Sequence, residues 1–141
     1  MEGIILEKLE YRITVPSAYA FLIRYLKAAH ADKKMVQISC YILDGTLQSY
    51  HMLHYLPSQL AAASILIARK VVGRNSWSPT LLKYTNYREE DIKPIARAVL
   101  AAKNSTIRRD DGSELQLQAV NKKYAKTTYG CVSNLTLPTD L

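Results

Sequence analysis

The hydrophobic positions of this chain recur with the spacing of α-helices along most of its length. The spacing predicts helices over residues 1–13, 16–31, 33–50, 79–86, 88–105 and 115–126. The stretch between Pro57 and Gly73 is different, because it is apolar or small on every side and carries no charge before Arg69. A helix without a polar face has to be enclosed by other helices. The pattern therefore predicts an all-α domain built around this central helix.

The ends of the central helix are marked by two residues. Pro57 suits the first helical turn, where its missing amide has no intrahelical partner, and Gly73 suits a left-handed helix end. Small residues between them let neighbouring backbones approach closely, and larger aliphatic residues fill the remaining space. The residues that we expect to hold the core together are Ala61, Ala62, Ala63, Ile67 and Trp77.

The same spacing predicts which side chains of the outer helices face the core. The expected core positions include Ile4, Ile5, Leu6 and Leu9 in the first helix, Leu47 near the end of the third, and Leu117, Val120 and Tyr124 in the last. Ser78 is expected to cap the brief helix that ends near Asn86. Residues 108–113 are predicted to form a charged loop. Residues 127–141 show no helical period, so they are interpreted as a tail.

Length, composition and charge agree with a single globular domain. The chain has 141 residues, of which 48% are hydrophobic, so it can bury a substantial core without disulfides or metals. Its two cysteines give no disulfide framework and favour a reducing compartment. The formal charge of +7 favours acidic partners or nucleic acid, but the basic residues are spread over every predicted helix.

Candidate catalytic and metal-binding residues are sparse. His51 and His54 lack a third ligand at a convincing spacing, so a loop role is favoured. Cys40 lies in an apolar helix and is interpreted as an inert core thiol. Asp110 and Asp111 lack the remaining oxygen ligands of a calcium loop. We therefore expect no enzyme activity, no cofactor and no metal site, and no segment long enough to span a membrane.

Four stretches of the chain resemble, in order and spacing, the C-terminal box of A- and B-type cyclins. They are residues 11–22, residues 57–70 with the run of three alanines, residues 77–94 beginning with Trp77-Ser78-Pro79, and residues 119–125. The resemblance implies a cyclin box, a five-helix bundle around a buried central helix, with an additional helix at each end. It divides the chain into a remnant of the preceding box with its linker (1–15), the C-terminal box with its final helix (16–126) and a tail (127–141).

The first nine residues resemble the last helix of the N-terminal cyclin box, so the chain looks like a C-terminal fragment of a cyclin. The apolar residues of this helix should then be partly exposed, or paired with a second copy of the chain. In the family, this helix and the linker contact the mobile C-helix of the kinase. The matching positions here are Glu2, Leu6, Tyr11 and Ile13. Packing of the last three against the chain's own second helix is the alternative.

The resemblance implies a mitotic cyclin that binds and activates a cyclin-dependent protein kinase in cell-cycle control, in the nucleus and cytoplasm. An alternative is a cyclin-like repeat that binds DNA or a transcription complex, for which the positive charge would supply phosphate contacts. Such a repeat should gather its basic residues on one helix face. The spread of basic residues favours the cyclin, so a nucleic-acid partner is not expected. A structural half that keeps the fold without the activity is compatible with the cyclin interpretation.

Overall fold

The computed structural model describes residues 1–74, 77–104, 107–108, 114–115 and 118–138. The helices are α1 (Glu2–Lys8), α2 (Ala18–Ala28), α3 (Lys33–Thr46), α4 (Pro57–Val71), α5 (Pro79–Thr85), α6 (Glu89–Asn104) and α7 (Ala119–Tyr124). Short 3-10 helices are η1 (Tyr50–His54), η2 (Thr127–Tyr129) and η3 (Val132–Asn134), and β1 (Ile107–Arg108) pairs antiparallel with β2 (Glu114–Leu115). The fold is all-α apart from this two-residue pairing, as the sequence predicts.

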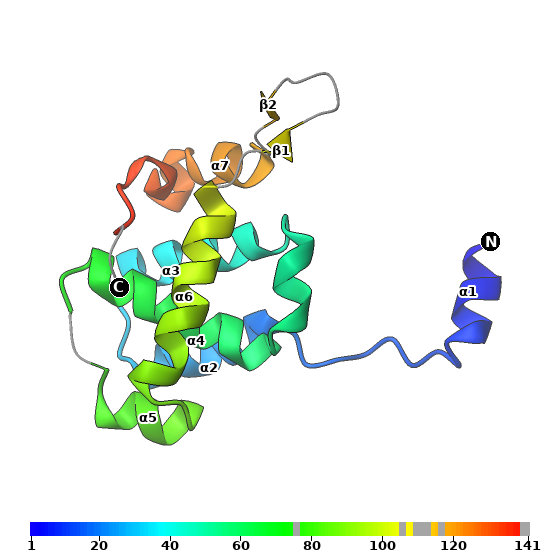
Figure 1. Ribbon diagram of the computed structural model, residues 1–141, viewed down its shortest axis with the longest axis horizontal. Helices are drawn as coiled ribbons and strands as arrows, with labels where there is room; N and C mark the ends of the chain where they lie inside the picture. The colour runs from blue at the N-terminus through cyan, green and yellow to red at the C-terminus, as the bar shows by residue number, and fades with distance from the viewer. Residues whose placement is uncertain (75–76, 105–106, 109–113, 116–117, 139–141) are drawn as a thin grey trace.

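Helix α4 lies at the centre of the bundle and packs against α2, α3 and α6 (Figure 1). Ten consecutive residues, from Leu60 to Arg69, are buried. Ala61, Ala62, Ala63 and Ile67 have no exposed surface at all. Since alanine side chains end at Cβ, the three alanines allow neighbouring helices to lie close to α4. The enclosed helix that the apolar pattern predicts is therefore present.

The ends of α4 have the geometry that its terminal residues favour. Pro57 occupies the first turn, and the preceding backbone N–H of Leu56 donates to Gln59 Oε1 at 3.0 Å. At the other end Gly73 is left-handed, with φ of 81°. The N–H of Arg74 donates to the carbonyl of Arg69 at 2.7 Å. These bonds form the helix-ending pattern that a left-handed glycine makes possible.

Helix α5 and Trp77 close one side of the bundle. Ser78 Oγ accepts a hydrogen bond from the N–H of Leu81 at 3.2 Å, which caps α5 as predicted, and the helix ends at the left-handed Asn86. Trp77 is half-buried against the core, and its Nε1–H donates to the carbonyl of Tyr87 at 3.0 Å. The indole thus fixes the chain on both sides of α5.

Helix α1 stands apart from the bundle, at the end of an extended linker formed by residues 12–17 (Figure 1). None of its residues is buried. Ile4 is 64% exposed, Ile5 52% and Leu9 49%. The prediction that these residues and Leu6 face the core is therefore wrong, because α1 does not reach the bundle. The exposure agrees instead with the expectation for a helix that belongs to a preceding box.

Three further predictions are wrong in their boundaries. Helix α1 ends at Lys8 rather than at residue 13. Helix α3 ends at Thr46 rather than at residue 50, and Leu47 is 84% exposed just beyond it. Helix α7 spans only Ala119–Tyr124, because Glu114–Leu115 is a strand. Of its three expected core residues, Tyr124 is buried and Val120 is half-buried, while Leu117 lies outside the described residues.

The segment after α7 packs on the bundle. It forms η2 and η3, which lie against α7, and η3 also contacts α3. Val132 is almost completely buried, at 2% exposure. A segment without a helical period can therefore still contribute to the core through single apolar residues. Across the described residues, no helix is both long enough and apolar enough to cross a lipid bilayer.

Candidate functional site

The predicted partner-binding residues lie on α1 and on the linker that follows it. Glu2 and Leu6 are four residues apart in the helix, so they lie on the same face. At 100° per residue, Ile5 and Leu9 fall on this face as well, while Ile4 lies roughly opposite. The face therefore combines three aliphatic side chains with one carboxylate. We call it the arm face.

The end of α1 joins Tyr11 to Leu6 through the backbone. The N–H of Tyr11 donates to the carbonyl of Leu6, and the N–H of Glu10 donates to the carbonyl of Glu7, both at 3.0 Å. Two such bonds at a helix end define the Schellman motif, which requires a left-handed residue directly after the helix. Glu10 supplies it, with φ of 49°, and Tyr11 is also left-handed, with φ of 57°. The motif thus links two of the four predicted contact residues.

The predicted contact residues are exposed to different degrees. Tyr11 is 69% exposed and Ile13 is 59% exposed, and Glu2 is exposed as well. Leu6 is half-buried. The alternative in which these apolar side chains pack against α2 is therefore not the arrangement in this structure. The four residues remain predicted contacts, and they are accessible to a partner.

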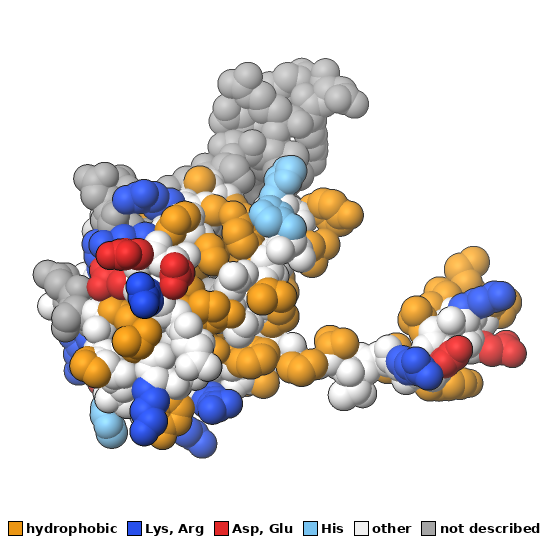
Figure 2. Space-filling model, turned by 60° about the horizontal axis from the view of Figure 1, so that its bottom comes forward, with side chains coloured by type: hydrophobic (Ala, Val, Ile, Leu, Met, Phe, Trp, Pro, Cys, Tyr) orange, Lys and Arg blue, Asp and Glu red, His pale blue; other side chains and the backbone are white. Residues whose placement is uncertain are grey.

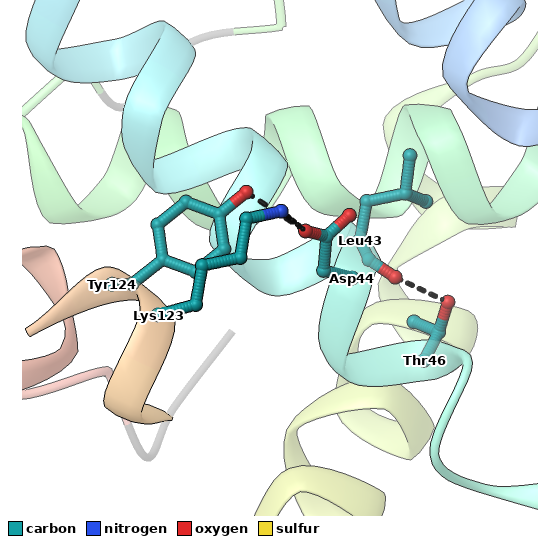
Figure 3. A network of polar contacts seen from close by, with 5 residues as sticks. All are labelled: Leu43, Asp44, Thr46, Lys123 and Tyr124. Carbon is teal, nitrogen blue, oxygen red and sulfur yellow. Dashed lines mark hydrogen bonds and ion pairs between the residues drawn. The ribbon is translucent and has the colours of Figure 1, made fainter. Parts of the chain in front are cut away.

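A network of polar side chains joins α7 to α3 (Figure 3). Asp44 accepts hydrogen bonds from Lys123 Nζ at 2.7 Å and from the Tyr124 hydroxyl at 2.9 Å. Nearby, the Tyr41 hydroxyl donates to Asn121 Oδ1 at 2.8 Å. Sequence reasoning missed this network because its partners are about 80 residues apart. No local spacing pattern contains such a pair.

Lys103 approaches the same region from α6. Its Nζ lies 3.4 Å from the centroid of the Tyr41 ring, as a cation–π contact requires. Burial lowers the pKa of Lys103 to about 8, although Asp44 acts in the opposite direction. Burial also raises the pKa of the Tyr124 hydroxyl, and its hydrogen bond to Asp44 adds to the rise. Both shifts follow from removing the charged form from water.

The cysteine and histidines offer little chemistry. Burial, assisted by Asp44, raises the pKa of Cys40, so its thiol is protonated at neutral pH and is a poor nucleophile. His51 and His54 are exposed in η1. Among the described residues, no three His, Cys, Asp or Glu side chains gather as a metal site would require. Asp110 and Asp111 lie outside the described residues.

The structure thus defines a box of five helices, α2 to α6, with α4 as the central helix and with the exposed helix α1 outside it. The model of the family described as "Cyclin, C-terminal domain" matches residues 16–138. The chain therefore belongs to the cyclin family.

The relatives of the chain are mitotic and A-type cyclins. The chain is 39% identical over 127 residues to G2/mitotic-specific cyclin-B2 of Rana japonica, covering 90% of this chain and 31% of the relative. It is 32% identical over 145 residues to Cyclin-A2-1 of Oryza sativa subsp. japonica, covering 98% of this chain and 28% of the relative. The chain thus spans less than a third of the length of these two relatives.

The family match extends past the predicted end of the box at residue 126 and includes η2 and η3. These two elements pack on α7. The division of the chain at residues 15 and 126 remains a prediction.

Proposed function

We propose that this chain is the C-terminal part of a mitotic cyclin of A or B type, and that it acts as a regulatory subunit of a cyclin-dependent protein kinase in cell-cycle control. The observation that carries this proposal is the family match over residues 16–138, supported by relatives whose names are those of mitotic and A-type cyclins. The family membership favours this function over the alternative of a DNA-binding repeat. Regulation without catalysis, in the nucleus and cytoplasm, is part of the proposal.

The arm face and the linker are the proposed kinase contact. Leu6, Tyr11 and Ile13 present apolar surface, and Glu2 adds a carboxylate at one end. An apolar helix face of this kind can hold a partner helix by packing. If the partner is the mobile C-helix of the kinase, the contact favours the position that completes the catalytic lysine–glutamate pair. The cyclin then activates by binding the active arrangement more tightly than the inactive one.

Self-association through α1 is the second proposed use of the same surface. The exposed aliphatic residues of α1 would lose contact with water if two copies of the chain paired. Pairing between copies would compete with kinase binding, since both need the arm face. Sedimentation of the chain with and without a kinase separates these two uses.

The proposal is tested by titrating the chain into a panel of purified cyclin-dependent kinases while binding and kinase activity are recorded. Leu6→Asp places a second carboxylate on the arm face and should weaken binding at least tenfold, a loss of about 1.4 kcal/mol. Ile4→Asp makes the same chemical change on the opposite side of α1 and is the matched control. Equal binding by the two variants would contradict the proposed contact.

The outcome for the unmodified chain is informative in both directions. Binding with activation would mean that the arm face and linker are a sufficient contact surface. Binding only after the region that precedes this segment in the relatives is restored would mean that this part supports the cyclin fold while the other part activates the kinase. Absence of binding in both forms would contradict the proposed function.

A further inference from the structure

A groove lies between α2 and α5 on the outer surface of the bundle. Its volume is about 490 Å³, and its lining includes Ala20, Ile23, Arg24, Lys27, Thr80 and Tyr84. The small alanine side chain leaves room, and Ile23 makes the floor apolar. A second hollow of about 420 Å³ shares Ile23, Lys27 and His30 with the first. Because they share these lining residues, the two hollows adjoin each other along α2.

The charge on this surface has one sign. No Asp or Glu lines either hollow. Between residues 11 and 43 the chain has five basic residues, Arg12, Arg24, Lys27, Lys33 and Lys34, and a single acidic residue, Asp32. The Asp32 carboxylate is already engaged, because it accepts a hydrogen bond from the N–H of Met35 at 3.2 Å and so caps α3.

The basic side chains at the rim are not neutralised. Arg24 and Lys27 are both exposed and make no ion pair with a carboxylate in the described part of the chain. In Figure 2, Lys and Arg side chains and a histidine lie beside hydrophobic side chains along the lower edge of the bundle. This edge shows no acidic side chain on the face in view.

Two contacts fix the positions of residues that border the groove and the second hollow. The Arg24 guanidinium carbon lies 5.9 Å from the centroid of the Tyr84 ring, so a cation–π contact reaches from α2 across the groove to α5. His30 is left-handed, with φ of 47°, and the N–H of Ala31 donates to the carbonyl of Leu26 at 3.1 Å. This helix end fixes the direction of the chain where the second hollow begins.

We propose that the groove between α2 and α5 binds an acidic peptide segment of a partner protein. An apolar side chain of the peptide packs on Ile23 and beside Ala20, while its Asp or Glu side chains pair with Arg24 and Lys27. A nucleic acid fits less well, because the basic groups border an apolar floor instead of following a continuous line of phosphates. The inference is independent of the proposed kinase contact, which uses the arm face.

The test uses the full chain and a fluorescently labelled short peptide of alternating leucine and glutamate, with binding measured by anisotropy. We expect this peptide to bind, and we expect its counterpart with glutamine in place of glutamate to bind much more weakly. Lys27→Glu reverses one rim charge and should weaken binding about tenfold. Lys122→Glu makes the same charge change at an exposed position of α7, away from the groove, and should leave the affinity unchanged.

A second variant separates a groove from general attraction between charges. Ala20→Phe fills the floor next to Ile23 without changing the charge, and folding should tolerate it because Ala20 is exposed. We expect it to weaken peptide binding as much as Lys27→Glu does. Unchanged binding by Ala20→Phe would overturn the proposal, as would equal binding of the glutamine peptide. Stronger binding of a single-stranded oligonucleotide would also overturn it and would favour a nucleic-acid site.

Discussion

Helices α1 and α4 are both rich in aliphatic residues, yet their environments are opposite. Helix α4 has ten consecutive buried residues, and α1 has none. The difference lies in what surrounds each helix, since α2, α3 and α6 enclose α4 while α1 lies outside the bundle. Apolar composition therefore shows that a helix needs a partner, but it does not show whether that partner is the same chain.

Length separates the two helices as well. Helix α4 has 15 residues and α1 has seven. Isolated helices shorter than about 12 residues are marginal in water, because starting a helix costs more than its few hydrogen bonds return. Helix α1 is therefore suited to gain stability when a partner covers it, whereas α4 is stable within its own bundle.

The largest expected effect comes from placing a charge in each helix. Ala63→Asp buries an unpaired carboxylate in the centre of α4, which costs about 3–5 kcal/mol and should prevent folding. Circular dichroism and thermal melting measure the outcome. Ile4→Asp in α1 is the control, and its melt should match that of the unmodified chain. A soluble Ala63→Asp protein with a cooperative melt would show that Ala63 does not lie in the core.

The glycine that follows α4 and the glycine within α1 should also respond differently to substitution. Gly73 is left-handed, and a Cβ added there would meet no atom within 4 Å. Gly73→Ala should therefore cost about 1–2 kcal/mol through backbone conformation alone. Gly3→Ala has equally open space but an ordinary helical backbone, so the bundle should melt as before. If the Gly73→Ala protein melts at the temperature of the unmodified chain, the backbone at the end of α4 must be able to adopt another conformation.

One ion pair of the bundle and one ion pair of the arm offer a third comparison. Asp44 lies between Lys123 and Tyr124, and Asp44→Asn should cost about 1 kcal/mol because the side chains are partly shielded from water. Glu10→Gln breaks the pair with Arg12, whose side chains are 70% and 83% exposed, and should not change the melting temperature. Chemical denaturation of both variants measures the contrast. Equal losses of unfolding free energy would show that burial does not determine how much each ion pair contributes to stability.

The smallest expected effect is a dependence of the stability of the bundle on pH. The pKa of Lys103 is about 8 when folded and about 10.4 when unfolded. Between these values the unfolded chain holds a proton that the folded chain has released, so Lys103 makes stability rise with pH. The raised pKa of Cys40 acts in the opposite direction at alkaline pH, because the folded thiol keeps its proton longer.

The contribution of Lys103 to this pH dependence is therefore measured as the difference between the unmodified chain and a variant without the lysine. Melting temperatures of the unmodified chain and of Lys103→Met are recorded from pH 7 to about pH 10. The advantage of the methionine variant should be largest at pH 7 and should shrink as the lysine of the unmodified chain becomes neutral. Parallel curves would show that Lys103 is not buried as its position indicates.

Local signals in the sequence predicted the central helix and its ends. Pro57, Gly73 and the Ser78 cap act within a few residues of their own positions, so their roles can be predicted without knowing the fold. The exposure of α1 could not be predicted from periodicity alone, because an apolar face looks the same whether it meets its own chain or another. The resemblance to a preceding box supplied that expectation.

Contacts between distant parts of the chain could not be predicted from the sequence either. The bonds of Asp44 to α7 join residues about 80 positions apart, and Val132 is buried in a segment without periodic pattern. The groove between α2 and α5 likewise depends on two helices meeting, although the excess of basic residues around Arg24 and Lys27 is visible in the sequence. Local patterns carry no information about such pairings.

The length of the linker between α1 and the bundle sets the effective concentration at which a partner bound to the bundle meets α1. Six extended residues, 12–17, reach at most about 20 Å, and Pro16 restricts the residue before it to extended conformations. A partner bound to the bundle therefore meets α1 at an effective concentration in roughly the millimolar range. Lengthening the linker with glycine and serine would lower that value without altering a single contact. If one partner binds both the arm and the bundle, the short linker would let two weak contacts act together as one stronger interaction.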